Sequence, residues 1–416
     1  MDPFAYRHSE LCCERVSLRA LAAEVGTPAY VYSKAALLEG YRAYDRAFAE
    51  VPHVVCYSVK ANSNLGVLGV LARAGAGADI VSGGELFRAL RAGVPAKKIV
   101  FSSVGKTRDE MRAALEAGIL LFNVESLSEL RKLDAVAREL GVRAPVALRV
   151  NPDVDPQTHP YIATGLRASK FGIPHAQALE AYAEAVGLKG VEVVGVDMHI
   201  GSQLTKVAPF ADAVARIAAL VKTLRERSIE VRLVDVGGGL GIRYRAETPP
   251  SHAEYATVLL PPLRELGVTV LLEPGRSIVG NAGVLVARVV DRKDTGEKKF
   301  VVIDAAMNDL IRPALYDSYH EIRPVNEARL GDPAEKVDVV GPVCESGDFL
   351  AKDRDLARTE EGDLLAVMSA GAYGFAMASN YNTRPRAVEV LVDGDRYTIV
   401  RRRETYEDLV AGETIP

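Results

Sequence analysis

The feature that most constrains this chain is an alternation of short apolar strands and amphipathic helices, repeated about eight times. The strand-like runs are "VVCYSVK", "GADIVS", "IVFSS", "LLFNVES", "VALRVN", "EVVGVDMHIGS", "RLVDVGGG" and "TVLLEPGR". Helical stretches such as "ALEAYAEAVG" lie between them. This order predicts an α/β fold, a closed (β/α)₈ TIM-type barrel. A doubly wound open sheet is the alternative, but its glycine fingerprint follows the first strand, whereas these glycines follow the seventh.

The pattern changes after "EPGRSIVGNAG". Strand-like runs such as "VLVARVV", "KFVVIDA" and "RAVEVLVD" then follow one another with few helical stretches between them. This spacing predicts a mostly antiparallel β-domain, a β-barrel or sandwich. We expect the (β/α)₈ barrel to span residues 33–280, and residues 1–32 to join residues 281–416 in the β-domain.

Composition excludes several classes of function. The 416 residues carry a formal net charge of -4, which gives no reason to expect binding to nucleic acid or to an anionic membrane. No apolar run approaches the roughly 20 residues of a membrane span. The four cysteines show no CxxC spacing, so neither a structural metal nor a disulfide framework is expected. A cytoplasmic location fits this composition.

Polar residues finish the barrel runs. In a (β/α)₈ barrel the carboxyl ends of the strands surround the active site, so these residues belong together. They are Lys60, Ser82, Ser103, Glu125, Asn151, His199, Gly237 to Gly239, Glu273 and Arg276. Stability alone does not require a polar ring on aliphatic strands.

Each motif also has a simpler reading. The "GGG" string exposes backbone amides that suit a phosphate, but it also suits a tight turn that needs positive φ. His199 by itself is better explained as a core histidine than as a catalytic one, and only its neighbours favour a catalytic role. Glu273 directly follows a buried run, which disfavours a surface ion pair. "VGKT" is not a P-loop, because Val100 stands where the first glycine is required.

Taken together, the polar residues at the strand ends suit pyridoxal phosphate. A lysine can bond to the aldehyde, amides can hold the phosphate, an imidazole can stack on the pyridine, and a carboxylate can keep its nitrogen protonated. A buried lysine such as Lys60 is tolerated mainly when it is paired or chemically used.

The motifs "YSVKAN", "HIGSQ", "DVGGGLG", "EPGR", "CESGD" and "GAYGFAMASNYN" occur in this order along the chain. Over nearly its full length the chain therefore resembles the fold-type III pyridoxal phosphate decarboxylases, which have an alanine racemase-like barrel. It is most similar to the branch that decarboxylates meso-2,6-diaminopimelate to L-lysine, the last step of that biosynthetic route.

The resemblance implies roles for residues across the chain. The catalytic residues would be Lys60, which bonds to the cofactor, His199 and Cys344. The cofactor would be bound by Lys60, Asp79, His199, Ser202, Gly238, Gly239, Glu273, Gly275, Arg276 and Tyr373. The substrate would be bound by Arg276, Arg312, Tyr316, Glu345 and Tyr373. Cys344 and Glu345 would reach the active site of a second subunit, which implies a homodimer with shared sites.

The substrate is inferred from its two ends. The unreacted end of diaminopimelate carries a carboxylate and an ammonium, which call for an arginine fork and an acid. "IRPALYDSYH" supplies Arg312 and Tyr316. Arg312 could instead be a solvated loop charge, and Cys344 an inert thiol. The alternatives are a related decarboxylase acting on ornithine, arginine or an antibiotic-pathway acyl amino acid, a racemase, or a non-catalytic regulator that binds pyridoxal phosphate. "TGLRASKFGI" lies where a mobile active-site segment is expected.

Overall fold

The chain forms two compact units in the computed structural model, which describes residues 2–154 and 170–416. The barrel unit comprises Leu38–Ile242 and Glu247–Ser277. The β unit comprises Met1–Leu37, Arg243–Ala246 and Ile278–Pro416. Most of the segment "TGLRASKFGI" lies outside the described residues. Within the described part of the chain, no helix combines the length and apolar character needed to cross a bilayer.

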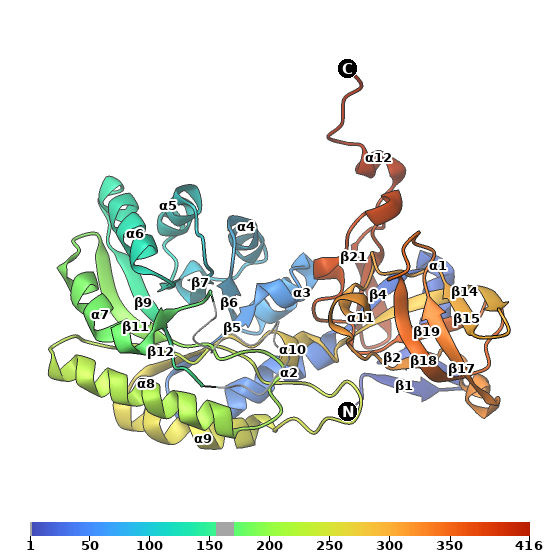
Figure 1. Cartoon of the computed structure of the whole chain (residues 1–416), viewed down its shortest axis with the longest axis horizontal. Coiled ribbons are helices and arrows are strands. Elements are labelled where there is room, and N and C mark those ends of the chain that lie inside the picture. Colours follow the sequence, from blue (N-terminus) through green and yellow to red (C-terminus); the bar gives the residue numbers. More distant parts are fainter. Residues whose placement is uncertain (1, 155–169) are drawn as a thin grey trace. The chain divides into compact units, whose positions relative to one another are not determined.

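Eight parallel strands close the barrel (Figure 1). They are β5 (His53–Ser58), β6 (Gly77–Ile80), β7 (Ile99–Ser102), β8 (Leu121–Val124), β9 (Ala144–Asn151), β11 (Val191–Asp197), β12 (Leu233–Asp235) and β13 (Thr269–Leu272). Strand β13 pairs with β5, and β8 pairs with β9, so the sheet has no free edge along this path. The predicted (β/α)₈ barrel is confirmed. The short β10 (Ile173–Pro174) adds to β9.

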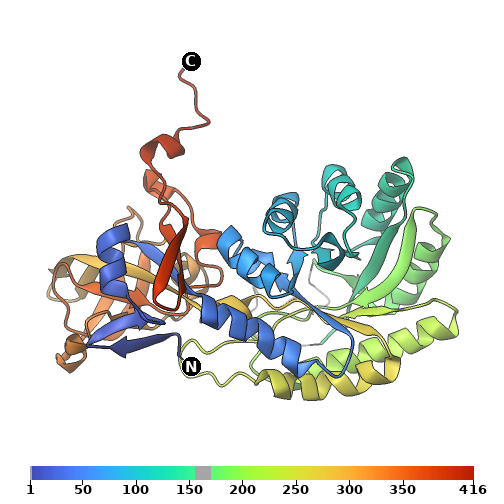
Figure 2. The same ribbon diagram turned by 180° about the vertical axis from the view of Figure 1, so that it is seen from behind.

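Helices surround these strands, with α4–α6 on one side and α8 and α9 on the other in Figure 1. Their bounds are α2 (Lys34–Ala47), α3 (Leu65–Arg73), α4 (Gly83–Arg91), α5 (Arg108–Ala117), α6 (Leu127–Glu139), α7 (Ala178–Gly187), α8 (Ala208–Glu226), α9 (His252–Leu266) and α10 (Arg276–Val279). Several begin at a Ser or Thr whose hydroxyl accepts a free backbone N–H, as Ser82 does for α4. Figure 2 shows α8 and α9 side by side, where Phe210 packs edge-on against Tyr255 at 4.8 Å between ring centroids.

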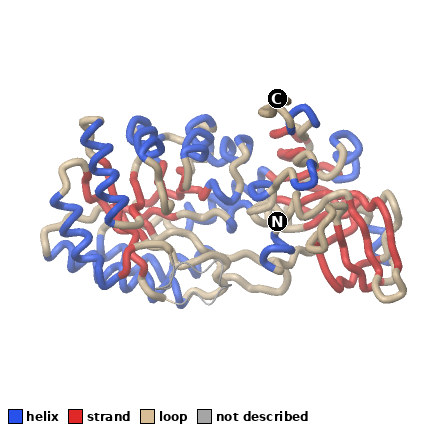
Figure 3. The backbone as a smooth tube through the Cα atoms, turned by 45° about the horizontal axis from the view of Figure 1, so that its top comes forward, coloured by secondary structure: helices blue, strands red, loops and turns tan. Residues whose placement is uncertain are grey.

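The β unit is built mainly of strands, as Figure 3 shows by colour. Its larger sheet has the order β18-β17-β15-β14-β4-β20-β21, with β19 joining β14 and β16, and most of these pairs are antiparallel. A smaller sheet contains β1–β3. The strands are β1 (Phe4–Arg7), β2 (Glu10–Cys13), β3 (Val16–Ser17), β4 (Ala29–Ser33), β14 (Gly283–Asp294), β15 (Lys299–Ile303), β16 (Ile322–Pro324), β17 (Ala334–Val340), β18 (Phe349–Ala357), β19 (Leu364–Val367), β20 (Val388–Asp393) and β21 (Arg396–Arg401). The helices are α1 (Leu18–Val25), α11 (Arg312–Tyr316) and α12 (Tyr406–Leu409).

Strand β4 explains how the N-terminal segment joins this unit. It pairs with β14 on one side and with β20 on the other, so residues from both ends of the chain share one sheet. Val31 lies in one apolar cluster with Val284 and Val390, and all three side chains are buried. The predicted mostly antiparallel domain, joined by the N-terminal segment, is confirmed.

The lysine of "VGKT" has a structural role in the barrel. Lys106 is buried, and its Nζ donates to the backbone oxygens of Ser103 and Asn123 and to Glu129 Oε1 at 2.7–2.8 Å. These bonds connect the loop after β7 to the end of β8 and to α6. An ammonium that satisfies three acceptors can remain charged without water.

We expect Lys106→Met to destabilise the protein by about 3–5 kcal/mol, because Glu129 would be left buried without its cation. Urea unfolding followed by circular dichroism measures this loss. The matched control is Lys222→Met, which removes an ion pair to Glu265 that joins the exposed faces of α8 and α9 at 2.6 Å. That change should cost about 0–1 kcal/mol. Equal losses in the two variants would contradict a structural role for Lys106.

Candidate active site

The inner face of the barrel changes from apolar to polar over two residues towards the carboxyl ends of its strands. Cys56, Val100, Leu121, Ala147 and Leu271 form one buried cluster contributed by five strands. Two residues further along the same strands or just beyond them come Ser58, Ser102, Asn123, Arg149 and Glu273. Because side chains two apart in a strand share a face, these polar groups form the next layer towards the carboxyl ends. The structure therefore brings them together at one mouth of the barrel.

Lys60 lies in the one-turn helix η1 (Val59–Ala61), directly after β5. Its Nζ donates to Asp79 Oδ2 at 2.6 Å. Asp79 is fully buried, and the same carboxylate oxygen also accepts the Ser58 hydroxyl at 2.7 Å. About a third of the Lys60 side chain is exposed, so the amine is paired yet still reachable. This ion pair explains how the fold tolerates a lysine at the end of a buried strand.

Glu273 follows β13 and is buried. Its Oε1 accepts hydrogen bonds from Ser102 Oγ at 2.8 Å and from Asn123 Nδ2 at 3.2 Å. Burial, together with the nearby carboxylates of Asp235 and Asp79, raises the pKa of Glu273 well above its usual range. A cationic group brought next to this carboxyl would favour its ionised form.

His199 lies two residues beyond β11 and is partly exposed. Its Nδ1 lies 3.2 Å from the backbone nitrogen of Gly238 and accepts that N–H, so the neutral ring carries its proton on Nε2. Burial, Arg149 and Lys60 all lower the pKa of His199 well below its ordinary value. The imidazole is therefore neutral at pH 7.

The glycine turn after β12 has no room for side chains. A Cβ on Gly238 would lie 2.2 Å from the Glu273 carbonyl oxygen, and Gly239 has φ of +110°. The loop after β13 is equally tight, because a Cβ on Gly275 would lie 2.9 Å from the Cβ of Ser58. Arg276 Nη2 lies 3.3 Å from Ser202 Oγ, which places a guanidinium beside a hydroxyl donor. A guanidinium and a hydroxyl on one rim suit a bound phosphate.

The barrel residues therefore fit pyridoxal phosphate. A reachable amine, a buried carboxyl, a neutral imidazole and an arginine all project from the ends of barrel strands. Each matches one chemical feature of that cofactor: the aldehyde, the ring nitrogen, the ring face and the phosphate.

Five predicted residues lie in the β unit: Arg312, Tyr316, Cys344, Glu345 and Tyr373. Arg312 is buried, not a solvated loop charge. Its guanidinium lies 5.3 Å from the ring centroid of Tyr244 and 5.8 Å from that of Tyr316. Its Nε donates to His320 Nε2 at 3.4 Å. These contacts hold the arginine in one orientation.

Cys344 and Glu345 lie in an exposed turn after β17. The turn is anchored by Asp348, whose carboxylate accepts the N–H groups of Met307 and Val343, both at 2.7 Å. The Cys344 thiol is free and exposed, so it is not the inert buried cysteine of the simpler reading.

Tyr373 has a positive φ of 56°, a strained conformation for a tyrosine.

Sequence reasoning missed several polar residues of the barrel mouth. Asn123, Asp197, Asp235 and Arg149 are all buried there. For Asn123, Arg149 and Asp235 the available signal was spacing, because each lies two residues after an apolar residue that packs in or against the inner cluster. Asp197 could not be found this way, since the pairing register of β11 shifts between Val193 and Gly195.

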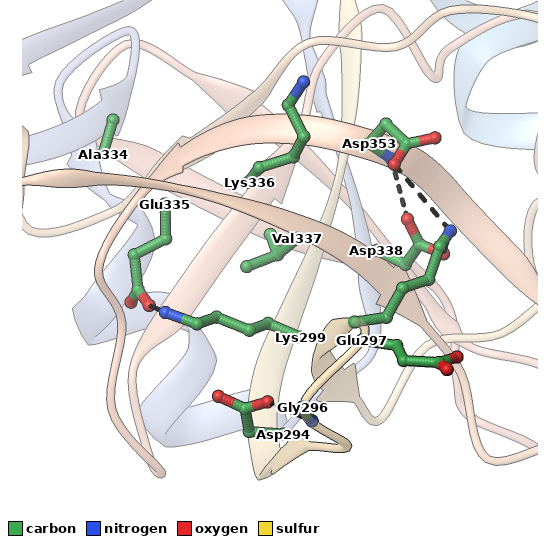
Figure 4. Close-up of a pocket in the computed structure, with 11 residues that line it drawn as sticks. Asp294, Gly296, Glu297, Lys299, Ala334, Glu335, Lys336, Val337, Asp338 and Asp353 are labelled. Atoms are coloured by element: carbon green, nitrogen blue, oxygen red, sulfur yellow. Dashed lines mark hydrogen bonds and ion pairs between the residues drawn. The ribbon is translucent and has the colours of Figure 1, made fainter.

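A cavity of about 530 Å³ in the β unit holds none of the predicted residues (Figure 4). Several of its charged side chains pair with one another, as Lys299 does with Glu335 and Lys298 with Asp338. Such pairs are typical of a solvated surface. This cavity gives no competing candidate site.

Comparisons with known proteins agree with the geometry of the site. Residues 34–280 match the family model described as "Pyridoxal-dependent decarboxylase, pyridoxal binding domain". The diaminopimelate decarboxylase of Pseudomonas aeruginosa is 59% identical, over 100% of this chain and 99% of its own. That of Vibrio cholerae is 55% identical over the same shares of the two chains.

Solved structures agree as well. The diaminopimelate decarboxylase of Helicobacter pylori, complexed with L-lysine, has a TM-score of 0.91 and 42% identity, and covers 94% of this chain and 98% of its own. The enzyme from M. jannaschii, also in complex with L-lysine, has a TM-score of 0.95 and 40% identity, and covers 100% of this chain and 98% of its own. These matches confirm the predicted resemblance and the predicted pyridoxal cofactor. The chain belongs to the pyridoxal-dependent decarboxylases, in the diaminopimelate decarboxylase family.

Proposed function

We propose that this chain is a pyridoxal phosphate-dependent carboxy-lyase that converts meso-2,6-diaminopimelate to L-lysine and carbon dioxide, the last step of lysine biosynthesis. The observation that carries the proposal is the pairing of a reachable Lys60 with buried Asp79, at the barrel mouth that also holds Glu273. The closely related proteins named diaminopimelate decarboxylase support the substrate.

Lys60 would hold the cofactor covalently, with Asp79 keeping its amine in place. Glu273, positioned by Ser102 and Asn123, would accept a hydrogen bond from the protonated pyridine nitrogen. When bound, pyridoxal phosphate supplies an electron sink for the electron pair released as the carbon–carboxylate bond breaks. An ionised Glu273 strengthens that sink because it keeps the ring nitrogen protonated.

The remaining barrel residues would orient the cofactor. The neutral His199 ring would pack against the pyridine face. Arg276, Ser202, the turn containing Gly238 and Gly239, and Gly275 after β13 would surround the phosphate. The Gly238 amide donates to His199 in the structure, so this glycine would act through its small size and through the histidine.

The β unit would recognise the end of the substrate that does not react. Arg312 and Tyr316, with Arg276, would bind the distal carboxylate, and Glu345 would bind the distal ammonium. Tyr373 would contact the cofactor and the substrate. Cys344 would donate a proton to the substrate carbon after carbon dioxide leaves.

We propose a homodimer in which each active site takes Cys344 and Glu345 from the partner. An exposed thiol in an anchored turn suits a residue that serves a second subunit. In this scheme residues 33–280 bind the cofactor, and residues 1–32 with 281–416 complete the site. A cytoplasmic location is also proposed, and the four free thiols are in keeping with it.

We expect the purified protein with pyridoxal phosphate to release carbon dioxide from meso-2,6-diaminopimelate far faster than from ornithine, arginine or lysine. The buried Arg312 calls for a distal carboxylate, which the other three lack. Labelled carbon dioxide release and mass spectrometry of the product measure this preference. Equal turnover of a rival substrate, or α-proton exchange with no carbon dioxide, would contradict the proposal.

Lys60→Ala should abolish the visible absorbance of bound pyridoxal phosphate and leave the far-UV circular dichroism unchanged, because the covalent attachment is lost. Borohydride reduction followed by peptide mapping gives the attachment site independently. Lys97→Ala, which removes an exposed lysine of the same barrel, is the matched control and should keep the absorbance. Persistence of the absorbance in Lys60→Ala would identify another lysine as the attachment point.

Cys344→Ala should lower turnover by about 10²–10⁴-fold with little change in cofactor affinity, because it removes a general acid. Mixing it with inactive Lys60→Ala should restore about a quarter of wild-type activity, since in a random mixture half the dimers are mixed and each has one intact site. Each variant mixed with itself is the control. No recovery in a mixture shown to exchange subunits would contradict shared active sites.

A further inference from the structure

Three carboxyl groups meet inside the barrel below its mouth. Asp197, Asp235 and Glu273 are all buried, and each offers a carboxyl oxygen within 4.8 Å of the others. They come from the ends of β11, β12 and β13, which are neighbours in the barrel. Three ionised carboxylates at this separation would repel one another strongly in a site without water. At least one of them must keep a proton.

The hydrogen-bond donors around the cluster are unequally distributed. Glu273 accepts the Ser102 hydroxyl and the Asn123 amide. Asp235 accepts the same Asn123 amide at 2.9 Å and the backbone N–H of Gly237 at 2.9 Å. Asp197 Oδ1 is buried, and no donor from the described residues reaches it. Hydrogen-bond donors stabilise an ionised carboxylate, so the negative charge is favoured on Glu273 and Asp235.

A bound cation is a poor alternative occupant. Asn123 directs its amide hydrogens towards both Asp235 and Glu273, and an N–H donor pointing at these oxygens would also point at a cation placed between them.

We propose that Asp197 is the member of this cluster that keeps a proton in the folded enzyme, acting as a positioning residue that leaves Glu273 free to ionise. The inference deepens the proposed function, since an ionised Glu273 is the partner required by a protonated pyridine nitrogen. As a neutral acid, Asp197 can donate to a neighbouring carboxylate instead of repelling it.

Ionisable groups from several elements surround Asp197. They are Asp235 at the end of the adjoining β12, Glu273 just after β13, Arg149 on β9, Asp79 on β6, Glu125 after β8 and the phenol Tyr182 on α7. Burial and then Glu273 raise the pKa of Asp197 well above its usual value, despite the opposing effect of Arg149. Burial raises the pKa values of Glu273 and Asp235 as well, so the missing donor at Asp197 Oδ1, among the described residues, decides which member keeps the proton. Arg149 is itself bound to Glu125 at 2.8 Å.

The test is Asp197→Asn in the full-length holoenzyme, because asparagine has the shape of the protonated acid. Infrared spectroscopy in D₂O should show a protonated-carboxyl stretch in the wild type that disappears in this variant. Asp235→Asn, the same isosteric change on the adjoining strand, is the matched control and should retain the stretch. Loss of the stretch in Asp235→Asn alone, or no such stretch in the wild type, would overturn the proposal.

The pH dependence of stability gives a second readout. If the pKa of Asp197 is higher in the folded than in the unfolded state, the folded wild type binds one more proton than the unfolded chain between these two pKa values. The folded wild type therefore becomes less stable as pH rises through this range. The unfolding constant of the wild type should therefore increase relative to that of Asp197→Asn by about tenfold per pH unit from pH 5 upward. A stability difference that does not change with pH would overturn the proposal.

These measurements do not depend on the substrate. If Asp197 holds the proton but the enzyme does not release carbon dioxide from diaminopimelate, the proposed function fails and the proton assignment stands. If the enzyme is active but Asp197 is ionised, only this inference fails.

Discussion

The ion pair between Lys60 and Asp79 is the contact on which the rest of the site depends. An amine at the end of a buried strand is tolerated only if its charge is matched, and Asp79 matches it from the next strand of the barrel. The pair is asymmetric, because Asp79 is fully buried while Lys60 is partly exposed. The carboxylate is thus a fixed anchor, and the amine remains accessible for bond formation.

Other charges at the barrel mouth are matched in the same way. Arg149 pairs with Glu125, and Lys106 with Glu129, and all four side chains are nearly or fully buried. These pairs join neighbouring strand ends to one another or to a helix. Buried pairs add little to net stability, but breaking one is costly, so they favour a single arrangement of the loops.

Glu273 shows how packing sets the chemistry of one carboxyl group. Ser102 and Asn123 donate to a single oxygen of Glu273, and Asn123 also reaches Asp235. The nearby Asp235 places negative charge beneath the barrel mouth. A cationic ring nitrogen would be drawn towards this charge, whereas a neutral ring would not. The negative charge of these buried carboxylates therefore favours a protonated pyridine.

Local pattern was enough to predict the fold class. Strand and helix periodicities depend on residues two to four apart, so the eight repeats and the later change to strands can be read along the chain. The same reading located Lys60, His199 and Glu273 at strand ends, because strand order places those ends on one side of a barrel. The motif resemblance added the family.

Only the tertiary structure decided which of these groups meet. Asn123 and Glu273 are 150 residues apart and touch because the barrel closes, which brings β8 and β13 to face one interior. The role of Asp197 was hidden by an irregularity in β11, and that of Lys106 depends on acceptors from three separate segments of the chain. Sequence therefore determined the elements and the residue types at their ends, whereas closure of the barrel determined the pairings and so the charge on each group. The reason is that periodicity is local, but electrostatic interactions depend on distances through space.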